Sequence, residues 1–135
     1  MSVQSIKTKE RELVELTRKI RPFRMAIINV TQEGFDTPTY RYIFNEFGPS
    51  LIAGVAYAGE GIYEFEINSG SFYNLTNVIQ ESNLISTSAN SLILTSMFTD
   101  SDKKTLSIVT YDIGEGLFLD VDGEILIYIK EFYGN

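Results

Sequence analysis

The sequence predicts an all-β protein, an antiparallel β-sandwich or jelly roll of about eight strands behind a short N-terminal arm that is helical or extended. The apolar spacing is seven residues before Pro22 and two residues after it. Gly, Asp, Asn and Pro clusters then separate short apolar runs, as turns separate strands. We therefore divide the chain into an arm, residues 1–24, and a β-sandwich body, residues 25–135.

The arm has one narrow apolar stripe. Ile6, Leu13 and Ile20 are spaced by seven residues, and Leu16 adds a second heptad position. Pro22 disfavours helix in the residue before it, so a helix here is only about two heptads long and marginal in isolation. The stripe therefore needs partners or a docking groove. The residues assigned to oligomerisation and attachment are Ile6, Leu13, Leu16, Ile20, Arg18, Arg21 and Phe23.

The body reads as strands with turns between them. The predicted strands cover residues 24–31, 39–47, 51–58, 62–68, 91–99 and 105–113, followed by a hairpin over 117–133. Asp122-Gly123 suits the type I′ turn of that hairpin. Residues 68–90 are rich in Ser, Thr and Asn, and they fit either one or two short strands or a long loop.

Strict alternation is clearest in the run IYEFEIN. Here Tyr63, Phe65 and Ile67 are expected to face the core while Glu64 and Glu66 face water. Two carboxylates on one strand face also fit a glycoside hydrolase, which would add a concave, aromatic-lined cleft. Exposed strand glutamates opposite an apolar set are common, however, and we rank a small hydrolase last among the functions.

Aromatic residues are frequent, and the alternation in residues 39–47 predicts Tyr40, Tyr42 and Phe44 on one face. Rings at alternate strand positions usually belong to a core or a subunit interface. Tyr40 and Tyr73 lie next to turn-rich sequence, so they are the candidates for exposed aromatic residues that bind a ligand such as a sugar.

Composition closes most catalytic routes. The chain has no Cys, His or Trp, which excludes cysteine nucleophiles, Cys/His zinc sites and the usual serine triad. Residues 1–24 carry seven basic and three acidic residues, a net charge of +4, whereas the remainder carries four and fifteen, a net charge of −11. Because the arm is basic and the body is acidic, we expect the arm to bind an acidic surface on a partner. No nucleic acid and no membrane are expected as partners.

An acidic run, DIGEGLFLDVDGE, offers hard oxygen ligands of the kind that bind calcium. The spacing fails the calcium-loop pattern, because its first and last ligand positions would be Phe118 and Ile129. Two turns in solvated acidic sequence account for the run better. No metal, cofactor or catalytic residue is therefore predicted.

Four short motifs in a fixed order carry a resemblance: QEGFDTP, then NEFG, then GIYEF, then the closing run ILIYIKEFY. Through these motifs, residues 24–133 resemble the β tip or knob domains of fibre and head-decorating proteins of tailed bacteriophages, especially those that infect Bacteroidota. The resemblance implies a non-enzymatic virion protein, a homotrimer that projects from the particle. Its N-terminal segment would bind another virion protein, either a capsid or a fibre subunit.

Three functions follow in order. The first is a homotrimeric head fibre or decoration knob in the virion, anchored by its basic arm. The second is a carbohydrate-binding or receptor-binding module of a tail fibre that recognises a host surface glycan. The third is the small hydrolase.

Overall fold

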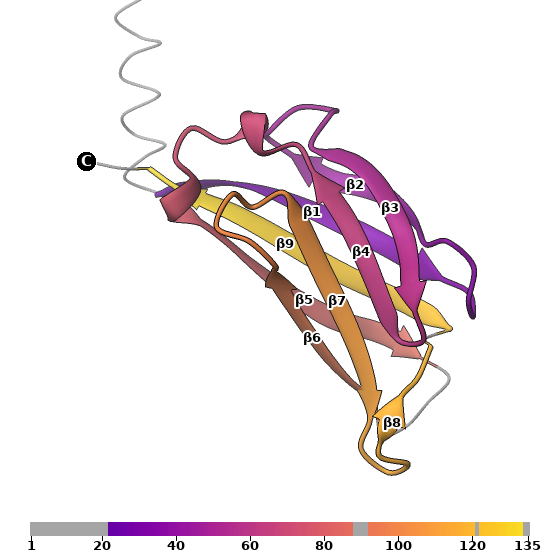
Figure 1. Cartoon of the computed structure of the whole chain (residues 1–135). Coiled ribbons are helices and arrows are strands. Elements are labelled where there is room, and N and C mark those ends of the chain that lie inside the picture. The colour runs from indigo at the N-terminus through magenta and orange to yellow at the C-terminus, as the bar shows by residue number, and fades with distance from the viewer. Residues whose placement is uncertain (1–21, 88–91, 121, 134–135) are drawn as a thin grey trace, which may run out of the picture.

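Two antiparallel sheets pack face to face in the computed structural model, which describes residues 22–87, 92–120 and 122–133 (Figure 1). Sheet A has the strand order β2-β1-β9-β5, and sheet B has the order β3-β4-β7-β6 with β8 against β7. The sheet A strands are β1 (Phe23–Gln32), β2 (Thr39–Asn45), β5 (Val78–Thr87) and β9 (Gly123–Phe132). The sheet B strands are β3 (Ile52–Gly59), β4 (Ile62–Ile67), β6 (Leu92–Phe98), β7 (Thr105–Asp112) and β8 (Leu117–Phe118).

The predicted β-sandwich is confirmed, with nine strands in the described residues, one of them only two residues long. Two 3₁₀ turns, η1 (Ser69–Ser71) and η2 (Leu75–Asn77), connect β4 to β5. The region left open by the sequence therefore holds these turns followed by one long strand.

The core lies between the two sheets because the strands alternate buried and exposed side chains. In β4, Tyr63, Phe65 and Ile67 are buried as predicted, while Glu64 and Glu66 lie on the outer face. The residues of β1, β9 and β7 that complete this core are Ala26, Ile28, Val30, Ile125, Ile127, Ile129, Leu106 and Ile108.

Polar contacts join the edges of the two sheets. At one edge, the Gln80 side chain donates to the Ser96 carbonyl at 2.8 Å, and the Ser82 hydroxyl donates to the Ser96 hydroxyl at 2.6 Å. At the other edge, the Ile52 N–H donates to the Tyr42 hydroxyl at 2.9 Å. Burial raises the pKa of Tyr42 above its ordinary value.

Two local predictions are wrong. A β-bulge at Ile43 places Tyr42 opposite Ile28 and Phe44 opposite Ile27, so Phe44 points away from the core whereas Tyr42 points toward it. The hairpin predicted over residues 117–133 is not formed either, because β8 pairs with β7 in sheet B while β9 pairs with β1 and β5 in sheet A.

The sandwich has two distinct ends. Pairing of Phe23 with Phe132 puts the start of β1 beside the end of β9. We call this end, with the loops at 46–51, 68–77 and 99–104, the base. The opposite end, which we call the tip, carries the loops at 33–38, 60–61 and 113–116, and β8 lies there (Figure 1).

Candidate assembly surface

A buried ion pair stabilises the base. The Arg24 Nε donates to the Glu131 Oε1 at 2.7 Å, and the second Glu131 oxygen accepts the Tyr73 and Asn74 backbone N–H groups at 2.6 and 2.7 Å. Arg24 also donates to the Ser71 carbonyl at 2.7 Å. The two side chains are only 11% and 4% exposed, so the ion pair fixes the η1–η2 loop to the first and last strands of the body.

Aromatic rings enclose the same guanidinium. The Arg24 Cζ lies 3.9 Å from the Tyr73 ring centroid and 4.6 Å from that of Phe47, which packs edge-on against Phe72 at 5.1 Å. The sequence assigned Arg24 to the arm, but the structure places it in β1 with its charge neutralised inside the body. The sequence analysis did not predict this cluster. A signal for it was present, because Glu131 is two residues after Ile129 in the same strand and therefore points to the same, inner face.

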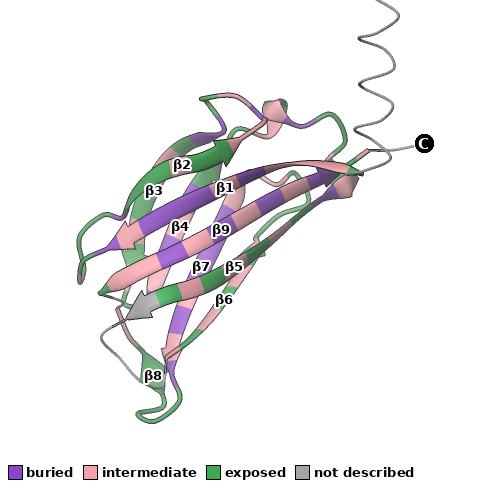
Figure 2. Cartoon of the chain, turned by 180° about the vertical axis from the view of Figure 1, so that it is seen from behind, coloured by how far each residue is buried: buried purple, intermediate pink, exposed green. Residues whose placement is uncertain are grey.

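The outer face of sheet A is apolar next to the base. Three rows of paired residues cross the strands here. The row at the base pairs Phe23 with Phe132, and in the third row Ile27 lies between Phe44 and Tyr128. Exposed fractions are 37% for Phe132 and 42% for Phe44. None of the described segments crosses this face, which is turned toward the viewer in Figure 2.

The row between these two holds Met25, Lys130 and Ile79, which is 50% exposed. Lys130 forms an ion pair with Glu81 at 3.3 Å, and its Nζ lies 5.0 Å from the Phe23 ring centroid. We call these three rows the apolar face: Phe23, Met25, Ile27, Phe44, Ile79, Tyr128, Lys130 and Phe132 with Glu81.

Toward the tip the same sheet face becomes polar. Asn29 lies opposite Arg41 on one side, and Thr31 lies between Thr39 and Glu124. Apolar residues in this half include Leu126, across from Asn83, and Ile85 in β5, which is 49% exposed. The apolar half of the sheet is therefore the half from which the N-terminal segment begins.

Of the predicted attachment residues, only Phe23 is within the described part of the chain. It is the first residue of β1, half-buried, with its ring centroid 5.4 Å from that of Phe132. Six other predicted residues lie outside the described residues: Ile6, Leu13, Leu16, Ile20, Arg18 and Arg21. The boundary drawn after residue 24 falls inside β1, which begins two residues earlier.

The two candidate ligand-binding tyrosines are far apart. Tyr40 is 37% exposed and packs edge-on against Tyr42, opposite Val30 near the tip end of β1. Tyr73 is 87% exposed, with one ring face over Arg24 at the base. Val30 is six residues from Arg24 along the strand, roughly 20 Å, so the two rings do not form one site.

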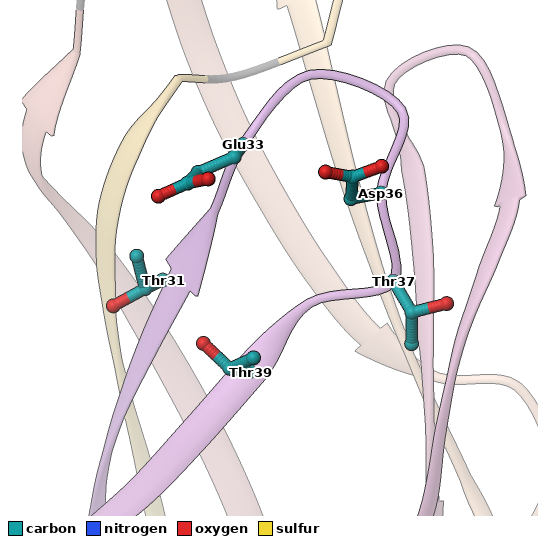
Figure 3. A pocket seen from close by; sticks show the side chains of 5 residues that line it. All are labelled: Thr31, Glu33, Asp36, Thr37 and Thr39. Carbon is teal, nitrogen blue, oxygen red and sulfur yellow. The ribbon is translucent and has the colours of Figure 1, made fainter.

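At the tip, the turn between β1 and β2 forms a small pocket of about 150 Å³. Threonine and carboxylate side chains line it: Thr31, Glu33, Asp36, Thr37 and Thr39 (Figure 3). Phe35, in the same turn, is 76% exposed. Oxygen-rich walls of this kind suit a hydroxylated ligand.

Glu64 and Glu66 line a shallow open hollow of about 500 Å³ on the outer face of sheet B. Gly54, Ala56 and Lys104 are among its other lining residues, and none of the lining residues is aromatic. The concave, aromatic-lined cleft expected of a glycoside hydrolase is therefore not found around these two carboxylates.

Carboxylates of the acidic run bind backbone amides of separate turns. The Asp112 Oδ1 accepts from Gly114 N–H at 2.8 Å, and the Asp122 Oδ1 accepts from Gly34 N–H at 2.5 Å. No three acidic side chains in the described residues gather closely enough to hold a metal ion. The run therefore stabilises turns.

Asp120 accepts hydrogen bonds from a backbone amide and from a tyrosine hydroxyl. One of its oxygens accepts from Gly61 N–H at 2.7 Å and the other accepts from the Tyr57 hydroxyl at 3.0 Å. Burial, together with the hydrogen bond to this carboxylate, raises the pKa of Tyr57 to about 12.

Two of the four motifs that carry the resemblance, QEGFDTP and NEFG, form turns as well, and the other two lie almost entirely in β4 and β9. The Gln32 side chain donates to the carbonyls of Gly34 and Asp36, both at 2.7 Å, and Gly34 has φ +58°. In NEFG, the Asn45 side chain donates to the Gly48 carbonyl at 2.6 Å, and Gly48 has φ +101°. Positive φ favours glycine at both positions.

Comparison of the chain with protein-family models, with curated proteins and with solved structures gives no match. Among the described residues, no helix is long and apolar enough to cross a membrane. The protein is an antiparallel β-sandwich with an apolar sheet face beside its base.

Proposed function

We propose that the protein is a structural protein of a bacteriophage virion, a homotrimeric head fibre or decoration knob that attaches to another virion protein through its N-terminal segment. The observation that carries the proposal is the apolar face, which none of the described segments crosses and which adjoins the start of β1 at the base. Large exposed apolar patches beside polar rims mark association surfaces in soluble proteins.

Two further features support an anchored knob. Residues 1–21 carry six basic and three acidic residues, whereas residues 22–135 carry five and fifteen. A basic segment of this kind is suited to an acidic site on a partner, and the acidic body disfavours random clustering. The ion pair of Arg24 and Glu131 at the base gives that segment a rigid point of attachment.

Incorporation into particles tests the proposal. In the phage genome that encodes the protein, deletion of residues 1–21 should abolish incorporation, measured by mass spectrometry of purified virions. The purified truncated body should retain the circular dichroism of a β-sandwich. A matched variant at the tip, Phe35→Ser, should incorporate like the wild type. Normal incorporation of the truncated protein, or absence of the wild-type protein from virions, would refute the proposal.

A second function, recognition of a host surface glycan, is supported by the pocket at the tip. Its three threonine hydroxyls and two carboxylates suit sugar hydroxyl groups, and Phe35 in the same turn offers a ring for stacking. On a glycan array, saturable binding by the full chain that Asp36→Asn and Phe35→Ala abolish would favour this function. Tyr73→Ala, at the base, is the control that should retain binding.

A further inference from the structure

The N-terminal segment joins the body beside the apolar face. Ile20 is the last residue of the predicted stripe, and it comes three residues before Phe23, the first residue of β1. Phe23 is also the first residue of the apolar face, packed on Phe132. The 21 residues that precede Pro22 therefore join the body at the apolar half of sheet A.

The body is acidic, whereas the apolar face is close to neutral. Residues 22–135 have a net charge of −10, so copies of the body repel one another unless they meet through a surface that is not acidic. Within the apolar face, the two charged side chains, Lys130 and Glu81, neutralise each other at 3.3 Å. On the outer face of sheet B, by contrast, Glu64 and Glu66 project side by side.

We propose that the apolar face is the self-association surface of the protein and that copies of this chain bury it against one another. The number of copies, three, rests on the proposed function, whereas the identity of the face does not. Each copy directs its tip away from the shared base.

Paired charge substitutions test which face is used. Ile79 on the apolar face and Ile93 on the outer face of sheet B are the same residue type, 50% and 44% exposed, and each lies on an edge strand. Ile79→Glu puts a carboxylate directly opposite Lys130, which limits its effect on the fold of a single copy. A carboxylate buried between copies should weaken association at least about tenfold.

Light scattering coupled to size exclusion, run over a concentration series of the full chain, gives the readout. Wild type and Ile93→Glu should have about three times the 15.3 kDa mass of one chain, and Ile79→Glu should dissociate at a concentration at least about tenfold higher. Thermal unfolding followed by circular dichroism verifies that both variants fold. A monomeric wild type, equal weakening in both variants, or weakening confined to Ile93→Glu would overturn the inference.

Thiol labelling supplies a second measurement that disturbs the surface less. The chain has no cysteine, so Ile79→Cys and Ile93→Cys each introduce a unique thiol. At concentrations where the wild type is associated, Ile79→Cys should react with a maleimide at least about tenfold more slowly than Ile93→Cys, and dilution should remove the difference. Equal rates would overturn the inference. They would remove the apolar face as support for the proposed function, whereas attachment through the N-terminal segment is tested separately by incorporation of protein lacking residues 1–21.

Discussion

Replacing Arg24 with methionine should destabilise the body strongly. Arg24→Met keeps an aliphatic stem between the Phe47 and Tyr73 rings but removes the guanidinium from a carboxylate whose side chain is only 4% exposed. Glu131 then remains buried with two backbone N–H donors and no counter-ion. Removing one partner of a buried ion pair typically costs about 3–5 kcal/mol.

That loss is a large share of the total stability of a domain, typically about 5–15 kcal/mol. For a chain of this length it corresponds to a fall in Tm of roughly 10–20 °C. Urea unfolding followed by circular dichroism measures the free energy, at one protein concentration because association also raises stability. The double variant Arg24→Met/Glu131→Gln should recover part of the loss, since it removes the uncompensated charge.

Lys130→Met is the matched control. Lys130 is next to Glu131 in β9 and points to the opposite face of the sheet, and its ion pair with Glu81 has side chains 25% and 59% exposed. Breaking such a pair costs at most about 1 kcal/mol. If Arg24→Met destabilises the protein no more than Lys130→Met does, the base does not depend on the buried ion pair.

Two further predictions concern the tip. Gly61 has φ +71°, and an added Cβ would lie 2.6 Å from the Thr110 carbonyl oxygen, so Gly61→Ala should cost at least about 2 kcal/mol in urea unfolding. Gly48→Ala, at φ +101° with nothing within 4 Å, should cost only about 1 kcal/mol, and equal losses would contradict the steric argument. The pKa of Tyr57 is about 12 in the folded state against 10.0 normally, so its contribution to stability is complete below pH 10 and is lost as the pH rises toward 12. The unfolding free energy of Tyr57→Phe should therefore fall less steeply than that of the wild type between pH 10 and 12; identical slopes would show that the bond to Asp120 does not perturb the tyrosine.

The sequence predicted the fold class where hydrophobic alternation follows burial. In β4 each inward residue is apolar, and the strand was predicted with the correct faces. In β5 the inward positions Gln80 and Ser82 are polar because they bond to Ser96 across the edge of the sandwich. This strand therefore carries no alternating apolar signal, and residues 68–90 were left open.

The candidate surface was only partly predictable. Phe23 was among the residues assigned to attachment from the sequence, but the bulge at Ile43, which turns Phe44 outward, depends on pairing with β1. The ion pair of Arg24 and Glu131 joins residues 107 positions apart, which local patterns do not register. One signal was present in β9: apolar residues occupy both alternating sets in ILIYIKEF, and a strand that is apolar on both faces usually has both faces covered.

Because β1 starts where β9 ends, the sandwich offers very different sites for fused sequences. A tag or reporter added after the C-terminus would crowd the end at which the N-terminal segment leaves the body. A peptide inserted within residues 113–116 would extend from the far end, where Gly114, Glu115 and Gly116 are all exposed. If particles carry this protein by its base, that turn is a display position from which an inserted epitope would face outward into the medium.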